Sequence, residues 1–274
     1  MEKKTEKSRK VAALPRGVKG IYRVIDLLDV LGEYPLGLTL TELCNHLQLP
    51  KSTVHRILNV LLDRQYVRET LERGKFALGY EILRLSKGCQ VGLNFLQEAR
   101  PLLIELNQAI DENVILAVLD KPHHQIIYLD KLDSSKTIRL VSHIGEIAPV
   151  HCTALGKALL SGFSDEELLQ VLSDYELKRF TERTITDIKA FLSEMNEVRK
   201  QGYSLDLQEY RSEVVCVAAP INSEAGKPVA AVGVSAPAGR LEQSRLEHVE
   251  HLVVETAKKI SELIAYVPLP GPWG

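Results

Sequence analysis

The 274-residue chain has no long apolar run and no leader-like start. No stretch approaches the roughly 18 consecutive apolar residues of a membrane-spanning helix, so we expect no membrane segment. The first ten residues, MEKKTEKSRK, are charged and lack the apolar core of a secretory signal. Both absences favour a cytoplasmic protein.

Cysteine is also scarce, and the four that occur are scattered as Cys44, Cys89, Cys152 and Cys216. No two of them form a CxxC pair, which disfavours structural zinc, and their spacing indicates no disulfide framework. His123 and His124 are adjacent, so their side chains diverge, and we interpret them as solvated turn residues. The sequence therefore predicts no metal site and no cofactor.

Charge is present but unevenly distributed. Residues 1–90 hold 16 Lys and Arg against 10 Asp and Glu, a net charge of about +6, whereas the remainder holds 18 against 26, about −8. The whole-chain value of −2 hides this asymmetry. A basic module joined to an acidic one is typical of phosphate binding at one end only. Residues 1–16 are predicted to be a basic disordered tail.

Residues 38–76 carry the most informative pattern. Thr39 and Glu42 match a capping box at a helix start, and the apolar residues that follow recur on one helical face. Pro50 cannot continue that helix, and a second helix is expected from about Lys51. A third amphipathic helix precedes the pair, and a strand–turn–strand hairpin around Gly74 follows it. This order predicts a winged helix-turn-helix domain over residues 17–79.

The polar face of the second helix suits DNA. It carries Lys51, Ser52, Thr53, His55, Arg56 and Asn59. Basic side chains there can donate to guanine edges or phosphates, and an asparagine can pair with adenine. Arg73 and Lys75 at the hairpin tip are placed to contact the phosphate backbone. The alternative is a plain helical hairpin with a solvated face, which the third helix and the hairpin disfavour.

The rest of the chain is divided into linker helices at 80–111, a second domain at 112–267 and a tail at 268–274. Apolar positions on the linker helices are expected to pair with a second subunit, to pack on the second domain, or to do both. The second domain is predicted to be α+β. Its expected strands span 114–119, 125–131, 137–141, 213–221 and 228–235, and its helices span 152–160, 164–172, 187–201 and 241–265.

One strand of this domain is unusual, because Ala231, Gly233 and Ser235 place only small side chains on one face. Either a helix packs very close there or a small ligand fills the space. Cys216 on the neighbouring strand could supply a convergent polar group, as could Asp206 and Glu209 in the expected loop before it. The two acids are equally well explained as turn caps, or as partners of Arg211 or Arg183.

An enzyme is the competing class of function. Cys216 would be its nucleophile, with His151 or His143 as base and Asp206 or Glu209 as the orienting acid. No nucleophile elbow, phosphate loop or HExxH motif occurs. Because a cysteine on a buried strand usually acts as a small apolar residue, we expect no catalytic residues.

Three segments together resemble the IclR family of bacterial transcriptional regulators. They are LPKSTVHRIL (49–58), GEIAPVHCTALGKALLS (145–161) and GYSLDLQEYRSEVVCVAAPI (202–221), and the strand VAAVGVSAP (229–237) matches the end of the family pattern. The resemblance spans roughly residues 17–265. One departure is that Asn222 directly follows Ile221, where the family usually has an aromatic residue first.

The resemblance implies a GAF-like α/β second domain that binds a small effector, such as an organic, sugar or aromatic acid. Its pocket would include Ala154, Leu155, Gly156, Asp206, Cys216 and Ser235, and we add Glu209 as a candidate. Family members bind double-stranded operator DNA as homodimers and often form tetramers. The sequence therefore predicts an effector-controlled DNA-binding regulator, without distinguishing a repressor from an activator.

Overall fold

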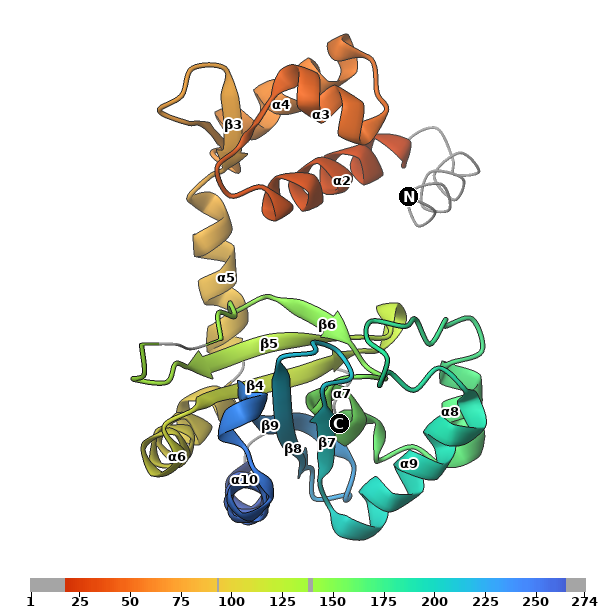
Figure 1. Ribbon diagram of the computed structural model, residues 1–274. Helices are drawn as coiled ribbons and strands as arrows, with labels where there is room; N and C mark the ends of the chain where they lie inside the picture. The colour runs from red at the N-terminus through yellow and green to blue at the C-terminus, as the bar shows by residue number, and fades with distance from the viewer. Residues whose placement is uncertain (1–17, 93, 138–139, 265–274) are drawn as a thin grey trace. The chain divides into compact units, whose positions relative to one another are not determined.

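The computed structural model describes residues 18–92, 94–137 and 140–264, and it divides into two units at Gly92 and Leu93 (Figure 1). This division falls within the segment 80–111 that was expected to be the linker. Helix α5 (Glu81–Gly92) belongs to the first unit, and helix α6 (Asn94–Ile110) belongs to the second. The tails expected at 1–16 and 268–274 lie outside the described residues.

The first unit contains the predicted winged helix-turn-helix. Its elements are α2 (Lys19–Glu33), β1 (Leu38–Thr39), α3 (Leu40–Leu47), α4 (Lys51–Asp63), β2 (Val67–Glu69) and β3 (Lys75–Leu78). The three helices share one core, in which Leu27, Leu43 and Leu58 are almost fully buried. The sheet order is β1-β3-β2, so the predicted hairpin gains a third, very short strand.

Local signals set the start of α3 and of α4. The Thr39 hydroxyl accepts a hydrogen bond from the Glu42 amide at 3.3 Å, and the Glu42 carboxylate accepts one from the Thr39 amide at 2.7 Å. This is the predicted capping box. Helix α3 ends at Gln48, which is left-handed with φ 54°, and Pro50 then leads directly into α4. The predicted helix pair is thereby confirmed.

The second unit is built on a six-stranded antiparallel sheet with the order β6-β5-β4-β9-β8-β7. Its strands are β4 (Asn113–Asp120), β5 (Gln125–Leu132), β6 (Ile147–Pro149), β7 (Ser204–Leu207), β8 (Val214–Asn222) and β9 (Pro228–Pro237). Strands β7, β8 and β9 follow one another along the chain and pair in that order as a meander. Strand β9 also pairs with β4 at the centre of the sheet.

Helices cover both faces of this sheet (Figure 1). Helices α6 and α10 (Gln243–Ile264) pack on one face, and α7 (Ala154–Leu160), α8 (Asp165–Val171) and α9 (Ile188–Gln201) pack on the other. Side chains alternate between the two faces. Thus Val232 and Val234 join the core under α6 and α10, whereas Ala231 joins the core under α7.

Two predictions about strands were wrong. The strand expected at 137–141 is not found at Thr137, Leu140 or Val141, while residues 138–139 lie outside the described residues; β6 pairs with β5 instead. Strand β7 was missed, so Asp206 lies within a strand and not in a loop. Both β6 and β7 have no more than four residues, too few for an alternating pattern to stand out.

Within the described ranges, no helix combines the length and the apolar character needed to cross a lipid bilayer.

Candidate functional site

The predicted DNA-facing residues lie together on the exposed side of α4. Lys51, Ser52, His55, Arg56 and Asn59 are exposed, and Thr53 is half-buried. The opposite side of the helix is fixed in the core by Val54, Ile57, Leu58 and Leu61. Among the described residues, neither Lys51 nor Arg56 forms an ion pair. The Asn59 amide lies 3.4 Å from Nδ1 of His55, so these two side chains support each other on successive turns.

The hairpin tip presents one cation more openly than the other. Gly74 has φ +80°, a conformation that favours glycine, and exposed Arg73 precedes it. Lys75 Nζ lies 2.8 Å from Glu72 Oε2, and this hydrogen bond raises the pKa of Lys75. Glu72 therefore partly neutralises Lys75, whereas Arg73 has no ion-pair partner among the described residues.

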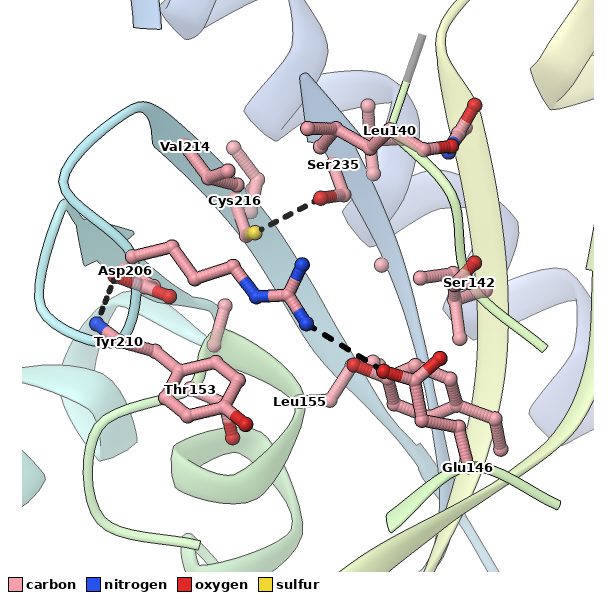
Figure 2. A pocket seen from close by; sticks show the side chains of 18 of the residues that line it. Leu140, Ser142, Glu146, Thr153, Leu155, Asp206, Tyr210, Val214, Cys216 and Ser235 are labelled. Atoms are coloured by element: carbon pink, nitrogen blue, oxygen red, sulfur yellow. Dashed lines mark hydrogen bonds and ion pairs between the residues drawn. The ribbon is translucent and has the colours of Figure 1, made fainter. Parts of the chain in front are cut away.

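A polar row crosses four strands of the second unit. In the register of the sheet, Asn113 on β4 pairs with Ser235 on β9, Ser235 pairs with Cys216 on β8, and Cys216 pairs with Asp206 on β7. Directly opposed residues share a face of the sheet. All four side chains line one cavity on the α7 side, and Figure 2 labels Ser235, Cys216 and Asp206. The sheet itself therefore supplies a polar floor.

Helix α7 covers the next row of the same face. A Cβ on Gly233 would lie 2.9 Å from the Val217 carbonyl oxygen of β8 and 3.1 Å from Leu155 Cδ2 of α7, so a larger residue here would press on both the neighbouring strand and the helix. The Ser204 hydroxyl donates to the Ala154 carbonyl at 2.6 Å and holds the first turn of α7. The small strand residues therefore serve both purposes considered above: a helix packs on Gly233, and a cavity opens at Ser235.

The wall of the cavity comes from strand β5 and from two loops. Tyr128 on β5 forms part of the wall, together with Leu140, Val141, Ser142 and Glu146 before β6 and Tyr210 and Arg211 after β7. The Asn113 side chain donates to the Leu140 carbonyl at 2.7 Å, which fixes the loop over the row. The sequence prediction did not include these wall residues, because only the folded sheet brings segments so far apart in sequence together.

Five of the seven predicted effector-binding residues line the cavity: Ala154, Leu155, Asp206, Cys216 and Ser235. Gly156 does not. A Cβ there would lie 2.2 Å from the Val150 carbonyl oxygen, so this glycine allows α7 to pack against the preceding segment. Glu209 does not line the cavity either.

Glu209 belongs to a buried charge cluster that the sequence prediction missed. Lys157 Nζ, on α7, lies 2.6 Å from Glu209 Oε1 and 2.9 Å from Glu194 Oε1 on α9. Burial alone would lower the pKa of Lys157, but the two carboxylates outweigh it and raise that pKa. The alternative in which Glu209 or Asp206 pairs with Arg211 or Arg183 is not found, because Arg211 pairs with Glu146 and Arg183 lies 3.5 Å from the Leu207 carbonyl oxygen.

Asp206 both caps a turn and borders the cavity. Its Oδ1 accepts hydrogen bonds from the amides of Glu209 at 2.7 Å and Tyr210 at 3.4 Å. Burial raises the pKa of Asp206 to about 7, against the opposing effect of the Glu209 amide. Its carboxyl group can therefore change protonation state near neutral pH while remaining fixed in place.

The geometry does not assemble a cysteine nucleophile. The Cys216 thiol donates to the Ser235 hydroxyl at 3.2 Å, and burial raises the pKa of that thiol. His151 instead contacts Tyr175 Oη at 2.8 Å and the Lys178 carbonyl oxygen at 3.0 Å, and His143 is exposed and does not line the cavity. Neither histidine is next to the thiol, and the neighbouring Asp206 carboxyl group raises the thiol pKa further, so Cys216 stays neutral and is a poor nucleophile.

The adjacent histidines point to separate partners. His123 Nδ1 lies 2.8 Å from Asp120 Oδ2, whereas the ring of His124 packs on Tyr175 with centroids 5.4 Å apart. Across the parts of the chain that the structure describes, no three His, Cys, Asp or Glu side chains are grouped as metal ligands would be.

Comparison with known families matches both units. The IclR helix-turn-helix domain model matches residues 20–70, and the model of the bacterial transcriptional regulator IclR C-terminal domain matches residues 90–262. The HTH-type transcriptional regulator KdgR of Escherichia coli (strain K12) is 32% identical over 93% of this chain and 96% of its own length. The acetate operon repressor of Salmonella typhimurium is 31% identical over 93% of this chain and 95% of its own length.

Solved structures agree with this assignment. IclR of Thermotoga maritima superposes with a TM-score of 0.73 at 26% identity, covering 90% of this chain and 98% of its own. An IclR homologue from Microbacterium hydrocarbonoxydans, solved in complex with 4-hydroxybenzoate, gives a TM-score of 0.77 at 25% identity and covers 89% of this chain and 98% of its own. The two curated relatives are, by name, a transcriptional regulator and an operon repressor, and the chain belongs to the IclR family of DNA-binding transcriptional regulators.

Proposed function

We propose that this protein binds an operator as a homodimer and that a small carboxylic acid, bound in the cavity of the second unit, changes that binding. The exposed basic side of α4 is the observation that carries the proposal, because Lys51 and Arg56 have no ion-pair partner among the described residues and the opposite side of the helix is buried in the core. In helix-turn-helix proteins the second helix enters the major groove, with its amino-terminal residues near base edges.

The roles on α4 follow from side-chain chemistry. Arg56 donates to a guanine or a phosphate, and Asn59 pairs with adenine in the groove. Ser52 and Thr53, at the start of the helix, bind a phosphate, with Lys51 beside them. On the hairpin, Arg73 contacts the phosphate backbone, since it has no ion-pair partner among the described residues.

A homodimer is supported by an apolar surface on α2. Ile21, Tyr22 and Ile25 recur on one side of this helix and remain 61%, 41% and 49% exposed. A cluster of large apolar side chains on the surface of a DNA-binding unit favours contact with another protein surface. A second copy is the partner that best fits, because a two-fold dimer matches the two half-sites of a palindromic operator.

The cavity supports a small acid that also carries a polar group. Asn113, Ser235, Cys216 and Asp206 offer hydrogen-bonding groups on the floor, and Leu155 supplies an apolar wall. The homologue from Microbacterium hydrocarbonoxydans was solved with 4-hydroxybenzoate, an acid of this kind. We extend that ligand class, though not that compound, to this protein.

The test is operator binding by the full-length protein to the promoter regions of its own and adjacent genes. Affinity should fall steeply as salt rises, since phosphate contacts release counterions. Arg56→Ala should weaken specific binding by about 1–3 kcal/mol, and Lys51→Ala should weaken it as well. Arg64→Ala, at the carboxyl end of the same helix, is the matched control. If both test variants bind like the wild type, the assignment of α4 as the recognition helix is wrong.

A further inference from the structure

Arg211 is the single cationic side chain among the described residues that line the cavity. Its guanidinium lies 5.5 Å from the centroid of the Tyr210 ring, which supports it from one side. Its ion-pair partner is Glu146, with Nη2 and Oε1 3.5 Å apart, and the dashed line ending at Glu146 in Figure 2 marks this pair. Arg211 and Glu146 thus connect two loops across the cavity.

The ion pair with Glu146 holds Arg211 only weakly. The side chains are 49% and 28% exposed, and the distance exceeds that of a close hydrogen bond. Exposed pairs of this type contribute little to stability. Glu146 has a second anchor, because its Oε2 accepts a hydrogen bond from the His143 amide at 2.9 Å. Glu146 can therefore release Arg211 and stay in place.

An independent observation points to a ligand at the same wall. The Ser142 hydroxyl is buried in the cavity lining, and it has no hydrogen-bond partner among the described residues. Ser142 and Glu146 both line the cavity, and Figure 2 labels both on the side of the cavity formed by the segment before β6. Buried hydroxyls are normally paired, because an unpaired one is costly. A ligand oxygen at this point would supply the missing partner.

We propose that Arg211 and Ser142 bind the carboxylate of the effector, and that Glu146 is an internal competitor that holds Arg211 until the acid replaces it. The inference rests on the proposed function and adds to it the residue that selects an anion. A guanidinium binds a carboxylate through two parallel hydrogen bonds, so the acid gains a closer contact than the long one to Glu146.

The charges around the cavity also define the class of acid. The lining holds one cation, Arg211, and two acids, Glu146 and Asp206, so one carboxylate of a ligand can take the place of Glu146 at Arg211, whereas a second carboxylate would face only acids. The polar floor of Asn113, Ser235 and Cys216 suits a hydroxyl or oxo group on the far end of the ligand. The expected effector is a monocarboxylic acid with such a group, and not a dicarboxylic acid.

The experiment measures ligand affinity by calorimetry on the full-length protein. A panel of 4-hydroxybenzoate, benzoate, lactate, pyruvate and gluconate is screened by thermal shift, with the corresponding neutral amides and with succinate and phthalate for comparison. For the acid that binds most tightly, Arg211→Gln should raise Kd at least about tenfold. Glu146→Gln should lower Kd about two- to fivefold, and the neutral amide should not respond to either change.

The double variant separates competition from general charge repulsion. If Glu146 acts through Arg211, Glu146→Gln has no effect on Kd once Arg211 is glutamine. Arg183→Gln and Glu182→Gln remove the same charges from exposed positions of the same unit that do not line the cavity. Both controls should bind like the wild type, and circular dichroism checks that every variant is folded.

Three outcomes would overturn the inference. Acids that bind and alter operator binding, yet bind equally to Arg211→Gln, would refute it and leave the proposed function intact. A Glu146→Gln effect that persists without Arg211 would refute the competitor role. If no carboxylate binds either the wild type or Glu146→Gln, both the inference and the acid-effector part of the proposed function fail, while operator binding stands on its own measurement.

Discussion

Asp206 shows how one side chain at the cavity links protonation to stability. Its pKa is about 7 in the folded protein, against an ordinary value of 3.8. Between about pH 4 and pH 7 the unfolded chain gives up this proton and the folded chain keeps it. The unfolded state then binds fewer protons, so the contribution of Asp206 to the free energy of unfolding falls as pH rises through this window and is constant above it.

Asp206→Asn removes this dependence while keeping an oxygen that can accept from the Glu209 and Tyr210 amides. At pH 7.5 we expect the free energy of unfolding of the variant to exceed that of the wild type by about 1–3 kcal/mol, which raises its unfolding temperature. This gain should vanish towards pH 4. Thermal unfolding followed at several pH values checks this. Asp174→Asn, at an exposed position, is the control, and a gain that does not depend on pH would contradict the assignment.

The sequence identified the cavity floor better than the cavity wall. Asp206, Cys216 and Ser235 were found because they stand near small strand residues and within a recognisable motif. Ser142 and Glu146 were missed, because a serine and a glutamate in a loop carry no local signal of burial or function. Lys157 was missed for a related reason: nothing in a short helical segment shows that a lysine will be enclosed by Glu194 and Glu209.

At the scale of elements, the amino-terminal cap of α3 fixes where the helix-turn-helix begins. Thr39→Ala removes the hydroxyl that accepts from the Glu42 amide, which should lower the stability of the first unit by about 0.5–2 kcal/mol. Thr39→Ser keeps the hydroxyl and should lose little of that stability. Chemical denaturation followed by circular dichroism measures both variants. Equal losses in the two would show that the cap does not stabilise α3.

Elements with local signals were predicted well. Helix α9 has an Asp187 side chain that accepts from the Ala190 amide at its start and a left-handed Gly202 at its end, and both were visible in the sequence. Strands β1, β6 and β7 had no such signal. A strand of two to four residues is defined by the neighbour it pairs with, and β6 pairs with β5 while β7 pairs with β8. Those neighbours are known only after folding.

At the scale of the whole molecule, assembly should depend on the apolar surface of α2. A charge at Ile21 or Ile25 would be buried between subunits without a partner, which is unfavourable. We expect Ile21→Glu and Ile25→Glu to shift the protein from dimer to monomer and to weaken operator binding. Sedimentation measures the first effect, and gel-shift titration measures the second.

Leu36→Glu is the control for this change, because Leu36 is 86% exposed and lies outside α2. It should leave both the mass and the operator affinity unchanged. A protein that stays dimeric with a charge at Ile21 and at Ile25 would place the subunit contact elsewhere.

The ion pairs of the buried Lys157 with Glu194 and Glu209 constrain how these three positions can evolve. Removing one member of a buried ion pair leaves an uncompensated charge and costs about 3–5 kcal/mol, a large part of the stability of an ordinary domain. A lineage cannot easily lose the lysine first and the acids later. Across related regulators we therefore expect these positions to change together, so that a homologue with an apolar residue in place of Lys157 also lacks the carboxylate of Glu209.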